Sequence, residues 1–95
     1  MIIIYDNLYG RTYRNITNII IRDITIFGAL KYRIDFWFDE GKKDILWLDE
    51  SPTRRYCYIQ LGDKQYGYKE IKKNEQKFKM KLTNELTKAA LEALP

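Results

Sequence analysis

The chain of 95 residues is long enough for one domain with a single small core. Hydrophobic residues make up 45% and aromatic residues 15% of it, which excludes a largely disordered chain, and the longest apolar run, Met1–Tyr5, is too short for a membrane span or a signal sequence. The net charge is +4. With one cysteine, the chain has no internal disulfide, and with no histidine it lacks the usual ligands of zinc, haem and iron–sulfur clusters. We therefore expect no metal and no cofactor.

The N-terminal third of the chain is predicted to be mostly strand. Met1–Tyr5 is typical of a buried strand, and residues 11–18, which are polar with interleaved apolar positions, fit a loop or a short strand. Ile19–Phe27 is rich in β-branched residues. Because charged and apolar residues are mixed on its two faces, we expect a bulge near Arg22–Asp23, and Gly28 ends or bends the strand.

The segment Lys31–Leu48 is predicted to form a β-hairpin that carries both tryptophans. Its first half alternates between apolar and polar residues, and Asp39–Gly41 fits a three-residue loop, a type I turn with Gly41 in the left-handed conformation. This loop predicts the cross-strand pairs Tyr32–Leu48 and Ile34–Leu46 on the core side, and Arg33–Trp47 and Trp37–Lys43 on the opposite side.

A second hairpin is predicted after Pro52, around a type II′ turn at Gly62–Asp63. Its cross-strand pairs would be Ile59–Tyr66, Cys57–Tyr68 and Tyr58–Gly67.

The C-terminal segment allows two interpretations. Lys77–Leu82 alternates strictly between lysine and apolar residues, which favours a strand with its three apolar residues inward, followed by a helix at about residues 84–94 that Thr83 caps. In the alternative, one helix begins near Lys73 and runs through both parts. We favour the strand, and therefore a mostly β (β+α) fold: five to seven antiparallel strands in a curved sheet or small barrel with a C-terminal helix.

Catalytic constellations are poorly supported. Cys57 has an inward parity and no histidine to activate it, and Ser51, the sole serine, lies in a Pro-containing turn. Glu70–Lys72 matches the E-x-K half of a nuclease signature, which would need an upstream acid such as Asp44 or Asp63 to hold Mg²⁺. We expect a protein that is not an enzyme, with a metal-dependent nuclease as the remote alternative.

Two groups of residues are suited to binding. The side of the hairpins that faces away from the core carries tryptophan, tyrosine and arginine, which are common in protein-binding hot spots and in stacking platforms. In the alternative, this side is covered by another element as a second core layer and cannot bind a partner. The candidate partner-binding residues are Arg33, Trp37, Trp47, Arg54, Arg55, Tyr56 and Tyr58. The second group is a lysine-rich segment, and its candidate nucleic-acid-binding residues are Lys69, Lys72, Lys73, Lys77, Lys79 and Lys81. The segment Asp35–Glu50, with six acids and two lysines, has the opposite charge.

These features lead to a functional hypothesis and two alternatives. The first is a non-enzymatic binding protein that acts on a protein or nucleoprotein partner, such as a phage or mobile-element inhibitor of a host defence machine, similar to anti-CRISPR proteins. Ile, Lys, Asn and Tyr supply 37 of the 95 residues, which fits the AT-rich genome of a low-GC bacterium or its phage. The alternatives are a small basic nucleic-acid-binding domain and the nuclease. We expect the protein in the cytoplasm of a bacterial cell or a phage-infected host, and no membrane partner.

Overall fold

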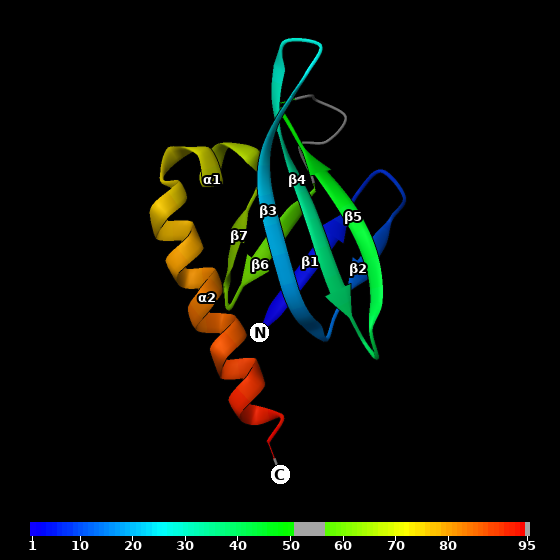
Figure 1. Cartoon of the computed structure of the whole chain (residues 1–95), viewed down its shortest axis with the longest axis vertical. Helices are drawn as coiled ribbons and strands as arrows, with labels where there is room; N and C mark the ends of the chain where they lie inside the picture. The colour runs from blue at the N-terminus through cyan, green and yellow to red at the C-terminus, as the bar shows by residue number, and fades with distance from the viewer. Residues whose placement is uncertain (51–56, 95) are drawn as a thin grey trace.

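The computed structural model of the chain describes residues 1–50 and 57–94, which form seven antiparallel strands in two sheets followed by two helices (Figure 1). The four-stranded sheet has the order β2-β1-β6-β7, with β1 (Ile2–Asp6), β2 (Arg11–Tyr13), β6 (Tyr58–Leu61) and β7 (Lys64–Tyr66). The three-stranded sheet has the order β3-β4-β5, with β3 (Ile16–Ile26), β4 (Ala29–Phe38) and β5 (Lys42–Leu48). The helices are α1 (Tyr68–Lys73) and α2 (Glu75–Glu92). The predicted β+α class and strand number are confirmed, but within the described residues the sheets do not close into a barrel. None of the described helices is both long and apolar enough to cross a membrane.

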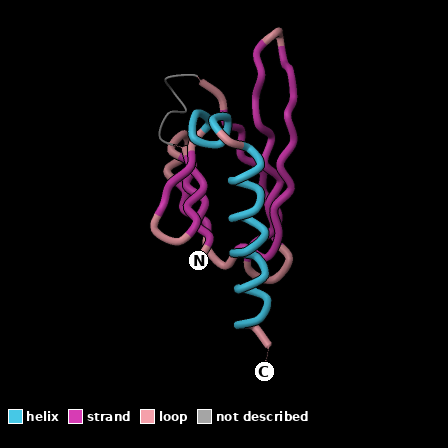
Figure 2. Tube along the Cα trace, turned by 90° about the vertical axis from the view of Figure 1, so that its left-hand side faces the viewer, coloured by secondary structure: helices cyan, strands magenta, loops and turns pink. Residues whose placement is uncertain are grey.

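One hydrophobic core lies between the two sheets and the helices. Its fully buried side chains include Ile4 and Ile59 of the four-stranded sheet, Ile34 of the three-stranded sheet, Ile71 of α1 and Phe78 of α2. Figure 2 shows α2 running along the open side between the two sheets. The hydroxyl of Tyr32 donates a hydrogen bond of 2.5 Å to Glu75 in the first turn of α2, so the helix is tied to the three-stranded sheet as well as packed on the core.

The hairpin registers follow the predictions in most places. In β4 and β5, Tyr32 pairs with Leu48 and Arg33 with Trp47 as expected, and Gly41 has a positive φ of 84°. Asp39 in the same loop also has a positive φ, which the predicted type I turn does not contain. The ladder of β6 and β7 includes the predicted Ile59–Tyr66 pair. The remaining predicted pairs of the second hairpin are absent from this ladder, because β7 ends at Tyr66 and the chain then enters α1.

The bulge predicted at Arg22–Asp23 is wrong. Both residues continue a regular ladder with β4, and the register shift lies instead between Ile16 and Asn18. The mixed pattern of β3 has another cause: Ile19 faces the core, whereas Ile20 lies on the opposite, half-exposed side, so apolar residues occur on both faces of one regular strand.

The strand predicted over Lys77–Leu82 is also wrong, because these residues belong to α2, and Thr83 lies within the helix rather than at its start. The alternative interpretation, one helix from near Lys73, is close to what is observed. The side chain of Asn74 caps α2 by accepting a 3.0 Å hydrogen bond from the backbone N–H of Lys77. Residues 72–82 contain no β-branched side chain and are mostly good helix formers, so helix propensity outweighs the local alternation.

The end of the β3–β4 hairpin projects beyond the rest of the molecule (Figure 1). Its two-residue turn is formed by Phe27 and Gly28, with φ values of 52° and 78°, which is typical of a type I′ turn. Glycine adopts this conformation freely, but a bulky aromatic residue does so only with strain. The Phe27 side chain is fully exposed, so this strain is not offset by packing within the described chain.

Replacing Phe27 with asparagine is expected to stabilise the protein by about 0.5–1 kcal/mol, because asparagine tolerates the left-handed conformation far better. For a domain of this size the melting temperature should rise by about 2–8 °C, measured by thermal unfolding followed by circular dichroism. Phe27→Ala is the control, since alanine keeps the strained positive φ and should not stabilise. A lower melting temperature for the asparagine variant would show that the turn is not strained.

Candidate binding surface

The central strand β4 organises the surface of the three-stranded sheet that faces away from the core, which we call the outer face. Alternation along β4 directs Arg33, Asp35 and Trp37 to the outer face and the residues between them to the core. Neighbouring strands complete the face at cross-strand positions: Arg22 of β3 and Trp47 of β5 flank Arg33, and Lys43 of β5 pairs with Trp37.

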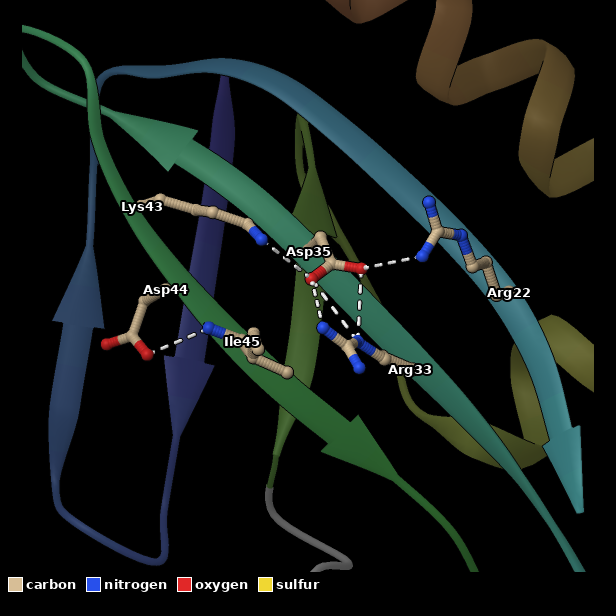
Figure 3. A network of polar contacts seen from close by, with 6 residues as sticks. All are labelled: Arg22, Arg33, Asp35, Lys43, Asp44 and Ile45. Atoms are coloured by element: carbon tan, nitrogen blue, oxygen red, sulfur yellow. Dashed lines mark hydrogen bonds and ion pairs between the residues drawn. The ribbon is translucent and has the colours of Figure 1, made fainter.

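Asp35 lies at the centre of the outer face and is only 2% exposed. Arg33 donates hydrogen bonds from Nε to Oδ2 (3.2 Å) and from Nη2 to Oδ1 (3.1 Å), and Lys43 Nζ lies 3.2 Å from Oδ1. Arg22 Nη1 approaches Oδ2 at 3.8 Å (Figure 3). Burial by itself would raise the pKa of Asp35, but the hydrogen bonds from Arg33 and Lys43 outweigh burial and lower the pKa below its ordinary value, so Asp35 is charged at neutral pH.

The cations around Asp35 outnumber the acid. Arg22, Arg33 and Lys43 all contact this one carboxylate, so the cluster carries a net charge of +2. Their side chains are 58%, 31% and 43% exposed, respectively, and therefore reach solvent while Asp35 does not. The surface is positive, and its positive groups are held in place by a buried acid.

Two tryptophans flank this cationic cluster. The guanidinium of Arg33 lies 5.8 Å from the centre of the Trp47 ring, and the ammonium of Lys43 lies 5.3 Å from that of Trp37, both within the range of cation–π attraction. Trp47 lies four positions along β5 from Lys43, which is the cross-strand partner of Trp37. The two indoles are therefore about 14 Å apart along the strand direction. Both are half-buried, and neither belongs to the hydrophobic core formed by the described residues.

No element of the described chain lies over the outer face. The helices sit beyond the edge formed by β3, and the four-stranded sheet is on the far side of the core (Figures 1 and 3).

The structure separates the residues that were predicted to bind a partner. Arg33, Trp37 and Trp47 come together on the outer face. Tyr58 lies in β6 of the other sheet, on the side away from the core, where the centre of its ring lies 5.2 Å from that of Tyr5. The remaining candidates, Arg54, Arg55 and Tyr56, lie outside the described residues. The two hairpins therefore belong to different sheets and do not share one aromatic surface.

Three residues of the cluster were absent from the sequence-based candidates: Arg22, Asp35 and Lys43. The predicted hairpin register pairs Lys43 with Trp37 and places Asp35 on the same side of the strand as Arg33 and Trp37. Both residues could therefore have been assigned to the outer face from that register. Arg22 was not, because its place beside Arg33 depends on the pairing of β3 with β4, which the sequence analysis did not predict.

The six candidate lysines for nucleic-acid binding do not form one patch. Lys69, Lys72 and Lys73 belong to α1, and the other three to α2. Within α2, Lys79 lies about 200° around the helix axis from Lys77 and from Lys81, on the opposite flank. Lys81 is turned toward β7, where its Nζ lies 3.1 Å from the hydroxyl of Tyr66.

None of the described residues considered for catalysis belongs to the outer face, and Ser51 lies outside the described residues. Cys57 is buried and its Sγ lies 3.4 Å from Asp6 Oδ1, and burial raises the pKa of this thiol. Asp44 accepts a 2.5 Å hydrogen bond from Tyr13, whereas Glu70 is exposed on α1. In the part of the chain that the structure describes, no three acidic or thiol side chains are grouped so that they could hold a metal ion.

Comparison of the chain with protein-family models, with curated proteins and with solved structures finds no match. The function must therefore be argued from the chemistry of the outer face. That face presents cations beside half-buried indoles on a three-stranded sheet.

Proposed function

We propose that the chain is a non-enzymatic binding protein, and that it contacts a negatively charged surface of a protein or nucleoprotein partner through the outer face. The observation that carries this proposal is the cationic cluster itself. Three positive side chains meet at one buried carboxylate, between two tryptophans, on a face that no described element covers.

The cluster is suited to binding because its side chains are already ordered. Asp35 holds Arg33 by two hydrogen bonds and Lys43 by a third contact, so these side chains lose less conformational entropy when a partner arrives. Tryptophan and arginine are also the residues that most often dominate binding energies. The net positive charge would steer an anionic partner toward the face.

The sequence-based hypothesis that the partner belongs to a host defence machine stays a prediction. Such machines are often nucleoproteins, and a cationic surface is compatible with either their protein or their nucleic-acid component. The alternative in which the lysines of α1 and α2 bind nucleic acid is weakened by their distribution, since Lys77 and Lys79 point to opposite flanks of one helix.

Replacing Trp37 or Trp47 with alanine is expected to weaken partner binding by more than about 1 kcal/mol, or about fivefold, while the fold remains intact. Tagged wild-type protein would be used to isolate the partner from an extract of the native host, with and without nuclease treatment. The affinity of each variant for that purified partner would then be measured. Met80→Ala, an exposed apolar position on α2, is the control and should leave the affinity unchanged.

The two ways in which this prediction can fail are distinct. If both tryptophan variants lose cooperative unfolding, the indoles are structural and the outer face is not a contact surface. If both variants fold and bind the isolated partner as tightly as the wild type, the partner contacts another part of the molecule.

A further inference from the structure

We infer that the outer face binds a single strand of nucleic acid, with phosphate groups on Arg22, Arg33 and Lys43 and with bases stacked on Trp37 and Trp47. This inference rests on the proposed function and names the chemical class of the partner. The alternative, an acidic protein surface, is an outcome of the test.

The cationic cluster keeps positive charge beyond what Asp35 neutralises. One carboxylate cannot neutralise the three cations that converge on it, so the cluster attracts further negative charge. Arg22 is the most accessible of the three, because its side chain is 58% exposed and its single approach to Asp35 is 3.8 Å. A guanidinium in this position has N–H groups with which to bind a phosphate.

Trp37 and Trp47 lie at opposite ends of the cationic cluster, about 14 Å apart along the sheet. A nucleic-acid strand alternates flat bases with phosphates, so it supplies both an anion for the centre of the face and stacking partners for its two ends. An acidic protein surface would supply carboxylates, but it does not repeat anions and flat groups along one chain as a nucleic-acid strand does.

Each of two cations also lies close to an indole. Lys43 lies against Trp37, and Arg33 against Trp47. A phosphate bound by these cations would therefore lie beside the two rings and would bring a base of the same strand close to them. Binding of a phosphate and stacking of a base would assist each other.

A similar pairing of cations and aromatic ring elsewhere in the molecule lacks this property. Lys64 and Lys81 both lie within 6 Å of the centre of the Tyr66 ring, at 5.3 and 5.8 Å. The Tyr66 side chain is buried, however, so it has no open face on which a base could stack. The outer face combines half-buried indoles with partly exposed cations, and this combination favours a single strand over a duplex, in which the bases are already stacked.

The test is a fluorescence-anisotropy titration of a fluorescein-labelled 20-mer oligothymidine with the full chain. With two or three phosphates neutralised, the affinity should fall about 7- to 18-fold when sodium chloride is raised from about 50 to about 200 mM, and a 20-base-pair duplex should bind more weakly. Trp37→Ala and Trp47→Ala should each lower the affinity about 5- to 150-fold. Circular dichroism of each variant verifies that it is folded.

Two charge variants distinguish phosphate binding at the cationic cluster from a general effect of the positive charge of the protein. Arg22→Ala and Lys79→Ala each remove one positive charge from an exposed side chain, but only Arg22 belongs to the cluster. Only Arg22→Ala should reduce the slope of log affinity against log salt by about 0.7. Equal effects of the two variants, or folded tryptophan variants that bind as the wild type does, would overturn the inference.

The outcome also distinguishes this inference from the proposed function. If the oligonucleotide does not bind at about 50 mM salt, but tryptophan variants lose affinity for a nuclease-treated protein partner, the outer face is a protein-binding surface and only the present inference fails. If tryptophan variants affect neither the oligonucleotide nor the isolated partner, both fail.

Discussion

Replacing Phe78 with alanine is expected to lower the free energy of unfolding by about 3–5 kcal/mol. The Phe78 side chain is 1% exposed, and its ring lies 5.0 Å from that of Tyr66 at the contact between α2 and β7. Removal of the ring would leave a cavity that the packed sheet and helix fill only in part. Because a domain of this kind is stabilised by about 5–15 kcal/mol in total, the loss should be plain in urea unfolding curves.

Met80→Ala is the matched control for this variant. Met80 is two residues away in the same helix, but its side chain is 66% exposed, so its truncation should change the stability by no more than about 0.5 kcal/mol. In an extended strand both side chains would point to the same side of the sheet. Similar large losses for Phe78→Ala and Met80→Ala would therefore contradict the helix.

Replacing Asp35 with asparagine should lower the free energy of unfolding by about 2 kcal/mol at neutral pH, because a buried carboxylate bound by several cations is exchanged for a neutral amide. The three cations are partly exposed and recover some hydration, which keeps the loss below that of a fully buried ion pair. Asp63→Asn is the control: Asp63 is exposed in the turn between β6 and β7 and is not buried among cations, so almost no change is expected.

The same variant should change how stability depends on pH. The pKa of Asp35 is lower in the folded protein than the value of about 3.9 for an unfolded aspartate, so the unfolded chain binds more protons in acid. The stabilisation by Asp35 is therefore complete above the unfolded pKa and is lost as the pH falls through the folded pKa. Urea unfolding from about pH 7 to about pH 2.5 should show that the wild-type and Asp35→Asn stabilities converge below about pH 4. Curves that stay parallel would show that Asp35 is not held by its cations.

Much of the fold could be predicted from local sequence patterns. The loop at Asp39–Gly41 sets the register of β4 and β5, and that register assigns each side chain of the hairpin to the core or to the outer face. The turn at Gly62–Asp63 does the same for β6 and β7, and Gly62 has the positive φ that a type II′ turn requires.

The incorrect predictions have two kinds of cause, one within the α2 segment and one in the pairing of distant strands. In Lys77–Leu82, lysine alternates with apolar residues at the period of a strand. Phe78 and Leu82 are also four residues apart, however, which places them on one face of a helix. The residue that caps this helix, Asn74, lies outside the alternating segment. Nothing local in either hairpin indicates which sheet it joins, so Tyr58 was grouped with Trp37 and Trp47 although it lies in the other sheet. The cationic cluster could be predicted only in part, since it needs the pairing of β3 with β4.

The position of Arg22 in β3 also matters before the protein has folded. Arg22 and Asp23 are the only charged residues between Arg14 and Lys31, so they separate two segments of seven uncharged residues that are rich in isoleucine. Long uncharged β-branched segments self-associate readily, and charged residues within them oppose this. A ribosome makes α2, which packs beside β3, only after β3 has emerged. We therefore expect Arg22 and Asp23 to oppose aggregation of the nascent chain during the interval in which this edge strand has no helix beside it.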